Sequence, residues 1–588
     1  MRALRSGRAV RLFALVAVLG LVIAACGGDA TSETTAGETP ETTAAPETTT
    51  TTAATTTTTV VGECDTAFCV KYNIHPDAAW ADGTAVTADD FAFTWEAIMD
   101  EGNDITSRQG YDQITGYEVV DEKTIVFNFE NIYAPWQTLF GAILPKHELE
   151  GQPFNEYWDD LITLGSGPFA MTEWVKDERI VLTRNADYWA SAGVDGSALG
   201  DVQQVVITFL EDSQTQVQAL RGQEIDMFYP QPQVSLVEEV GAIEGVEWEA
   251  GLGPIWEHFD FNHDNPALQN LYVKQAIAQG INRDAIVEAI VKPIAANAEA
   301  LGNSVWMTNS VYYEDHFNSV FPYDPVAAEA QLTDNGCTKG DDGIYVCDGE
   351  RLSFEWATTA GNEGRELQFE LAQADLKAIG IEAIAKFAPA AEVFSDENFY
   401  GDSTAWDVFN FAWVGSPDPA GGNTLYYCND AGEAPVGQEA LDLGLLNELR
   451  FCDPAVDELI RSTDGIVDPA ERAAVYNEAD ALWLSQIPLI PMYQKPTFFA
   501  WNSTIQGPKD NATQIGPFWN IETWTGKETV IYGADQQPES MQILEPDGNL
   551  FAAGLIATAV LQGAFTVTPD FQYVPQLISS AEAIVPGS

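Results

Sequence analysis

The stretch Val70 to Met99, VKYNIHPDAAWADGTAVTADDFAFTWEAIM, decides the fold that we expect for this chain. Its first residues alternate between apolar and polar side chains, which is the period of a half-buried strand, with the apolar ones at Val70, Tyr72 and Ile74. Asp82-Gly83 predicts a tight turn, because glycine tolerates the positive φ that such turns need.

A helix is predicted to follow this turn. Thr87 is a good N-cap residue, and Asp89 and Asp90 fall in the first turn, where the helix dipole favours anions. The apolar residues that come next at helical spacing predict the buried face of the helix: Phe91, Trp95 and Ile98. The stretch therefore predicts a strand, a turn and a helix in that order.

The same residues carry a family resemblance. The run WADGTAVTADDF at Trp80–Phe91 resembles the signature of family 5 extracellular solute-binding proteins, the peptide- and nickel-type receptors of ABC importers. Gly165–Phe169, GSGPF, and Asn185–Trp189, NADYW, are similar to the same family. So is the helical region after residue 273, which departs from the family pattern at Lys274 and Asn282, both expected on the surface. The resemblance implies an α/β fold with two lobes, of the large type II periplasmic-binding-protein class with an extra subdomain.

The length and net charge of the chain limit which functions are possible. At 588 residues the chain can form two large lobes. Its 26 basic and 89 acidic residues give a net charge of −63, spread along the sequence, which argues against nucleic-acid binding because phosphates need a basic face. The charge could steer a cationic ligand toward the protein, but a solvated acidic surface is the simpler interpretation.

The seven cysteines divide into one plus six. Six form three pairs that are local in sequence, as expected of disulfides in an oxidising compartment: Cys64–Cys69, Cys337–Cys347 and Cys428–Cys452. Four cysteines on a zinc ion would be the rival arrangement, but the spacings contain no CxxC pair. We therefore predict three disulfides, no metal and no cofactor.

Cys26 stands alone near the start of the chain. Four arginines precede the apolar run Leu12–Ala25, which is short for a bilayer span and typical of a signal segment. The run ends Ile-Ala-Ala-Cys, which resembles a bacterial lipobox and implies that Cys26 is lipidated after cleavage. The Thr-rich segment that follows cannot bury a core and is predicted to be a disordered tether of roughly 30–35 Å, whose glycosylation stays open.

Four residues are candidates for ligand binding. Tyr229 follows a predicted strand at the edge where open α/β sheets present ligands, and Trp256 and Trp413 suit an aromatic cleft. In peptide-binding relatives a carboxylate in the loop that contains Asp418 anchors the ligand's amino group. Ser416 stands where another acid would be expected, which places α-amino recognition in doubt.

Four residues near Trp256 are candidates for a metal site. The side chains of His258, Asp260, His263 and Asp264 could ligate a metal such as nickel, but positions 258 and 260 share a face of a strand that 263 does not. This spacing argues against a metal site.

The end of the chain is out of the family order. After Trp519 the sequence continues with segments similar to the family's opening, including Pro569–Ile578, and no copy of that opening precedes Cys69. The simplest account is a circular permutation, with Val530–Tyr532 joining the sheet of the first lobe and Ile584 lying beside Cys64. A truncated second domain from Lys527 is the alternative, although about sixty residues would bury little core.

These patterns give a division of the chain. We expect a lipoprotein signal peptide at 1–25, the disordered Thr-rich tether at 26–61 and an extra subdomain of lobe I at 62–165, completed by 546–588. The lobe I core is expected at 166–252, completed by 500–545, and lobe II at 253–499.

The expected function is that of a monomeric, lipid-anchored receptor on the extracytoplasmic face of a bacterial membrane. It would capture a small solute, with a peptide as the first candidate, between two lobes and deliver it to an ABC permease. A secreted hydrolase is disfavoured because the chain has no GxSxG, HExxH or glycine-rich nucleotide loop. A ligand sensor that signals through a partner remains an alternative, and the fold class alone does not identify the solute.

Overall fold

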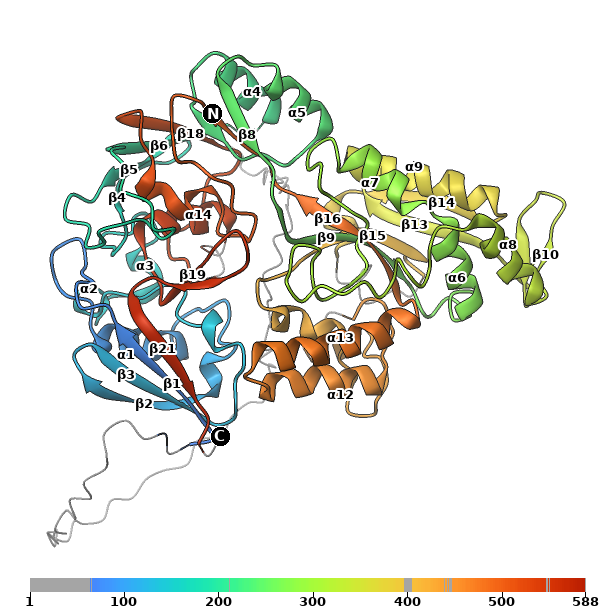
Figure 1. The fold of residues 1–588 in the computed structure, drawn as a ribbon, viewed down its shortest axis with the longest axis horizontal. Helices are drawn as coiled ribbons and strands as arrows, with labels where there is room; N and C mark the ends of the chain where they lie inside the picture. The colour runs from blue at the N-terminus through green and yellow to red at the C-terminus, as the bar shows by residue number, and fades with distance from the viewer. Residues whose placement is uncertain are drawn as a thin grey trace, which may run out of the picture.

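The computed structural model describes residues 64, 66–210, 212–395, 404–437, 439–440, 443, 447–545, 548 and 550–586. These residues form two lobes that lie side by side (Figure 1). The predicted signal segment, Cys26 and the tether lie outside the described residues. Within the described residues, no helix has the length and the apolar character that crossing a bilayer requires.

The opening stretch forms the predicted elements. Strand β1 (Phe68–Ile74) leads through the Asp82-Gly83 turn, where Gly83 has φ +86°, to helix α1 (Ala88–Met99) with Thr87 as its N-cap. The buried Asp90 carboxylate accepts the Thr87 N–H at 2.8 Å and the Lys146 N–H at 3.0 Å. Phe91 is fully buried, so this helix is fixed both by its cap and by its apolar face.

One sheet of lobe I brings the two ends of the described chain together. Strand β21 pairs antiparallel with β1, with Ile584 opposite Cys69, and Cys64 Sγ lies 3.8 Å from the Ile584 carbonyl oxygen. The C-terminus accordingly lies at the end of this sheet (Figure 1). The order of the four strands is β2 (Ile114–Asp121), β3 (Thr124–Phe129), β1 and β21 (Ile578–Ile584).

The second sheet of lobe I has a C-terminal strand at its centre. Strand β18 lies between β6 and β7 and runs parallel to both. The predicted strand–helix–strand unit at residues 205–228 is therefore a parallel crossover from β6 to β7. The strand that lies between these two in the sheet, β18, comes about 300 residues later in the chain. The strand order is β4 (Phe169–Val175), β5 (Arg179–Arg184), β6 (Gln204–Phe209), β18 (Thr529–Ala534), β7 (Met227–Phe228), β17 (Phe499–Asn502) and β8 (Val246–Glu249).

Helices and a small hairpin complete lobe I. The C-terminal helix α14 packs so closely on the GSGPF segment that a Cβ on Gly165 would collide with the Val560 carbonyl group. The remaining elements are α2 (Lys146–Leu149), α3 (Phe154–Tyr157), α4 (Ser213–Arg221), α5 (Val234–Gly241), α14 (Phe551–Val560), β19 (Phe565–Val567), β20 (Tyr573–Pro575), η1 (Tyr111–Gln113), η2 (Trp136–Thr138) and η6 (Pro517–Thr523).

Lobe II is built on a mixed five-stranded sheet. Its order is β14 (Glu382–Ala388), β13 (Ser353–Thr359), β15 (Val408–Val414), β9 (Leu252–Phe261) and β16 (Leu489–Pro496), and a three-stranded sheet holds β10 (Thr338–Lys339), β11 (Tyr345–Cys347) and β12 (Glu350–Arg351). The helices are α6 (Leu271–Gly280), α7 (Arg283–Ile290), α8 (Pro325–Asp334), α9 (Glu363–Ala378), α10 (Ala390–Val393), α12 (Pro454–Ser462), α13 (Pro469–Ser485), η4 (Pro419–Leu425) and η5 (Thr463–Gly465).

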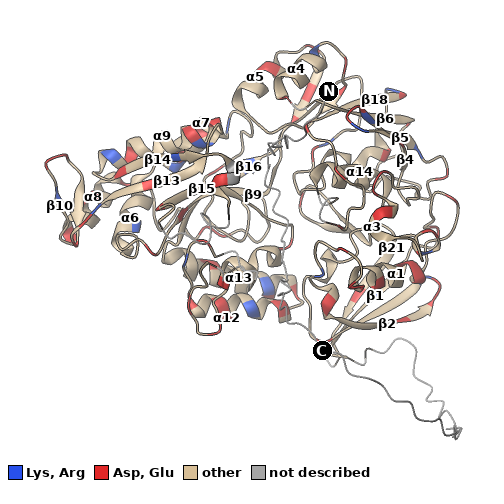
Figure 2. Ribbon diagram, turned by 180° about the vertical axis from the view of Figure 1, so that it is seen from behind, with Lys and Arg blue, Asp and Glu red and all other residues tan. Residues whose placement is uncertain are grey.

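Each lobe has its own large apolar core. The core of lobe I joins both of its sheets and takes side chains from β1, β18 and α14, whereas that of lobe II surrounds β9, β13 and β16. The three predicted disulfides are present, and Cys337–Cys347 closes the small β10–β11 hairpin. Acidic residues occur on the elements of both lobes, with few basic ones among them (Figure 2).

One expectation about the surface is wrong. Lys274 is 3% exposed, with Nζ 3.1 Å from His263 Nε2 and 5.5 Å from the centre of the Phe451 ring. Burial lowers the pKa of Lys274 to about 8, because the ammonium group has lost water. The sequence predicts a surface position from the residue type alone, whereas the chain around His263 and Phe451 covers this side chain.

Candidate functional site

A cleft of about 360 Å³ lies between the lobes. Lobe I contributes Ala134, Trp136, Gln137 and residues 570–573, and lobe II contributes the remaining wall. The lobes touch beside the cleft, where the Ala134 N–H donates to the Asp464 carbonyl oxygen at 3.1 Å. The volume is in the range of small-molecule sites. Its lining includes nine aromatic side chains: Trp136, Trp256, Trp306, Tyr312, Trp413, Tyr426, Tyr476, Phe571 and Tyr573.

Two of the predicted ligand residues form one wall of this cleft. Trp256 on β9 and Trp413 on β15 are direct partners in the antiparallel ladder, so their side chains lie on the same face of the sheet. Behind them the His258 ring packs 4.7 Å from Trp256 and 6.0 Å from Trp413, measured between ring centres. The indole N–H of Trp413 is buried without a hydrogen-bond partner, which leaves a donor beside the cleft.

Asp418 also lines the cleft, but its charge is already paired. Arg472 on α13 donates Nη1 to Asp418 Oδ2 at 2.8 Å and Nη2 to Asp418 Oδ1 at 3.0 Å, and the Ala420 N–H donates to Oδ1 at 2.9 Å. The Asp418 side chain is only 14% exposed, and the Arg472 side chain only 10%. Releasing Asp418 to hold a ligand's ammonium group would leave the buried charge of Arg472 without its ion-pair partner, which is costly. The geometry therefore does not favour a free carboxylate for α-amino recognition.

Sequence reasoning missed Arg472. The residue falls at the start of a helix, where the dipole disfavours a cation, and the chain has few basic residues to place there. That conflict was the available signal that Arg472 has a specific partner. A second carboxyl group, Asp464, lies nearby, and burial raises its pKa although the charge of Arg472 lowers it.

Tyr229 does not line this cleft. It follows β7 in lobe I, where its ring packs against Phe499 at 6.0 Å and stacks on Phe551 of α14 at 5.9 Å between ring centres. Burial raises the pKa of Tyr229 well above its usual value. A role of Tyr229 in ligand binding stays a prediction.

The four candidate metal ligands do not meet at one point, because they take part in separate contacts. His258 Nδ1 lies 2.7 Å from Asp260 Oδ1, on the shared strand face that the spacing predicts, whereas His263 contacts Lys274. Asp264 pairs with Arg450 at 3.3 Å. Among the residues that the structure describes, no three His, Cys, Asp or Glu side chains are grouped so that they could hold a metal ion.

Comparisons with known proteins give a consistent result. The family profile of bacterial extracellular solute-binding proteins, family 5, middle region, matches residues 65–434. The oligopeptide-binding protein OppA of Mycobacterium tuberculosis is 27% identical over 448 residues, which are 74% of this chain and 71% of that protein. The structure of the periplasmic EDTA-binding protein EppA has a TM-score of 0.65 at 20% identity, covering 78% of this chain and 85% of that one. AppA of Bacillus subtilis, in complex with a nonapeptide, has a TM-score of 0.55 at 20% identity, with 79% and 88% covered.

Proposed function

Because the chain belongs to the bacterial extracellular solute-binding proteins of family 5, which serve ABC importers, we propose that it captures a small solute and delivers it to an ABC permease. Its fold is that of the two-lobe, type II periplasmic binding proteins, and its relatives are binding proteins rather than enzymes. A peptide is the first candidate for the solute, since the relatives include proteins named for oligopeptide and for di- and tripeptide binding.

The observation that carries this proposal is the aromatic cleft with walls from both lobes. A ligand that touches Trp413 of lobe II and Phe571 of lobe I at once stabilises the closed arrangement, because either lobe alone offers only part of the contact. Trp256, Trp413 and Asp418 are the proposed ligand residues, with Asp418 acting together with Arg472.

A thermal-shift screen of the mature protein against di- and oligopeptides, sugars and metal chelates tests the proposal. A ligand at about a hundred times its Kd should stabilise the native state by about 2.7 kcal/mol. Trp413→Ala should weaken binding of that ligand by about tenfold or more, because a buried aromatic anchor is lost. Tyr323→Ala, an exposed aromatic residue outside the cleft, is the matched control and should bind normally. If no peptide, sugar or metal chelate raised the melting temperature, solute capture in the cleft would be refuted.

The lipid anchor at Cys26 is part of the same proposal. It is supported by the apolar run before that cysteine and by the extracytoplasmic role of the family. Acyl chains hold a protein at the membrane by burying methylene groups. Cys26→Ser should therefore release the protein from the membrane fraction, whereas the unchanged chain should stay in it. If Cys26→Ser and the unchanged chain are found in the membrane fraction in equal amounts, Cys26 does not carry the anchor.

We further propose that the family order is circularly permuted in this chain. The support is that β18 fills the place between β6 and β7 and that β21 pairs with β1. Strands β18 and β21 of the C-terminal segment are thus parts of the two sheets of lobe I. The division into an extra subdomain and a lobe I core, each completed from the C-terminal segment, is proposed on the same grounds.

A further inference from the structure

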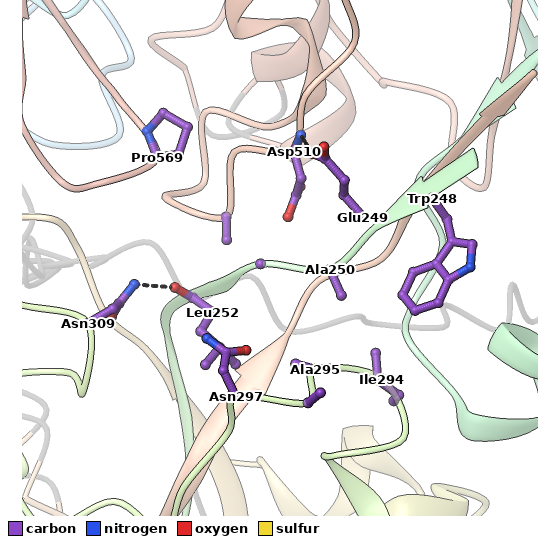
Figure 3. A pocket seen from close by; sticks show the side chains of 13 residues that line it. Trp248, Glu249, Ala250, Leu252, Ile294, Ala295, Asn297, Asn309, Asp510 and Pro569 are labelled. Carbon is purple, nitrogen blue, oxygen red and sulfur yellow. Dashed lines mark hydrogen bonds between the residues drawn. The ribbon is translucent and has the colours of Figure 1, made fainter. Parts of the chain in front are cut away.

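A second cavity, of about 400 Å³, lies where the chain crosses between the lobes. One crossing runs from β8 to β9 through Gly251, and the other runs from β16 to β17 through Thr497. The two crossings are joined by hydrogen bonds, since the Thr497 N–H donates to the Gly251 carbonyl oxygen and the Gly251 N–H donates to Thr497 Oγ1, both at 2.9 Å. We call this cavity the hinge cavity (Figure 3).

The hinge cavity contains a carboxylate that is not fully paired. Asp510 is 8% exposed, and its Oδ1 is buried without a hydrogen-bond partner, whereas Oδ2 accepts from the Thr497 hydroxyl. The Tyr229 hydroxyl also lies against this carboxyl group. Glu249 is held beside it, because Glu249 Oε2 accepts the Asp510 N–H at 2.9 Å. The Asp510 side chain points into the space between the crossings (Figure 3). A buried, unpaired carboxylate oxygen is unfavourable unless a donor or a cation meets it.

The rest of the wall comes from both lobes and is largely apolar, with Asn297 and Asn309 as its polar side chains. Ile294 and Ala295 of lobe II and Ala512 of lobe I are at most 7% exposed, and Trp248 and Leu252 lie beside them. The Asn309 amide is already used, since Nδ2 donates to the Leu252 carbonyl oxygen at 2.8 Å. The cavity thus combines two carboxylates at one end with an apolar surface at the other.

This combination selects a class of ligand. A divalent metal ion would need further carboxylate or imidazole ligands, and none are grouped here among the described residues. A small organic cation, with an ammonium or guanidinium-type group on an apolar body, fits both ends of the cavity. The cavity is also large enough for such a molecule, which would contact both interlobe crossings.

We propose that the hinge cavity is a second binding site, separate from the interlobe cleft, for a small organic cation held by Asp510 and Glu249. The cation meets Asp510 Oδ1 with an N–H donor, and its apolar body packs on Ile294, Ala295 and Trp248. Because the site touches both lobes, its occupancy acts on the hinge rather than on the solute directly.

Calorimetric titration of the mature protein in physiological salt tests this proposal with benzamidinium and benzamide, which share a shape and differ in charge. Benzamidinium should bind saturably at one site, and benzamide should bind at least about tenfold more weakly. Asp510→Asn should reduce benzamidinium affinity by about tenfold or more, and should leave the weak benzamide binding unchanged.

Two further variants keep the test decisive. Glu249→Gln preserves an acceptor for the Asp510 N–H and removes one charge, so it should also weaken benzamidinium binding even if Asp510→Asn folds poorly. Asp334→Asn, at an exposed position on α8, is the matched control and should change nothing. The proposal is overturned if benzamidinium shows no saturable binding, if benzamide binds equally well, or if neither cavity variant weakens binding relative to Asp334→Asn.

Discussion

A chain that ends at Lys527 should not fold into a stable lobe I. The deletion takes out β18, so the sheet of lobe I separates into β4-β5-β6 and β7-β17-β8, and it uncovers the edge of β1 that β21 pairs with. It also removes nine large apolar side chains from the core: Val530, Tyr532, Met541, Leu555, Ile556, Val560, Leu561, Leu577 and Ile578.

The magnitude follows from the size of this core contribution. Burial of one large apolar side chain is worth about 1.5–3 kcal/mol, so the segment contributes more than about 10 kcal/mol of burial. A whole protein of this kind has a net stability of about 5–15 kcal/mol. We therefore expect the truncated chain to lose its near-ultraviolet circular dichroism and to be digested rapidly by protease, at least over residues 64–249.

A rearranged chain is the matched control for this deletion. Because Ile584 lies opposite Cys69 in an antiparallel pair, a short linker can join the end of β21 to the start of β1 as a hairpin. A chain with residues 528–586 placed before Cys64 in this way, and ending at Lys527, should melt within a few degrees of the original. A stably folded, ligand-binding truncated chain would disprove the permutation and favour a separate C-terminal domain.

Loss of the Asp260 carboxyl group should make the protein less sensitive to alkaline pH. Asp260 is fully buried on β9, with Oδ1 2.7 Å from His258 Nδ1, and burial raises its pKa to about 8. The Glu448 carboxyl group lies beside it, and burial together with the charge of Asp260 raises the pKa of Glu448 well above its usual value. Two carboxyl groups in one apolar site cannot both ionise without a large cost.

The sign follows from proton counting. Between its ordinary pKa near 3.8 and about 8, Asp260 holds a proton in the folded state and has lost it in the unfolded chain. Stability from this group is thus complete below the unfolded pKa and is lost as the pH rises through the folded pKa. Burial also lowers the pKa of His258 to about 3, so the proton of the folded pair is on Asp260.

Urea unfolding at several pH values measures this effect. From pH 5 to pH 8 the unfolding free energy of the original chain should fall relative to that of Asp260→Asn by about 1.4 kcal/mol per pH unit. Titrating groups that do not touch Asp260 are common to both proteins, so their contributions cancel in the difference, whereas the contribution of Glu448 changes together with that of Asp260. Asp334→Asn, which is exposed, should follow the original chain. Parallel curves for the original chain and Asp260→Asn would show that Asp260 is ionised in the fold.

Local patterns determined much of this protein. The alternation at β1, the turn at Gly83 and the cap at Thr87 are each set within a few residues, and the structure confirms them. The disulfides could be paired because their cysteines are close in sequence. The family signature around Trp80 identified the fold class, since it specifies a strand–turn–helix unit as a whole.

Tertiary structure alone decided what depends on residues far apart in the chain. No local pattern shows that Arg472 reaches Asp418, that Lys274 is buried, or that Phe571 and Trp413 line the same cleft. Burial, charge pairing and cavity formation are set by which surfaces meet, and periodicity in the sequence only shows which faces are apolar. The interlobe cleft and the hinge cavity both form where segments more than two hundred residues apart come together.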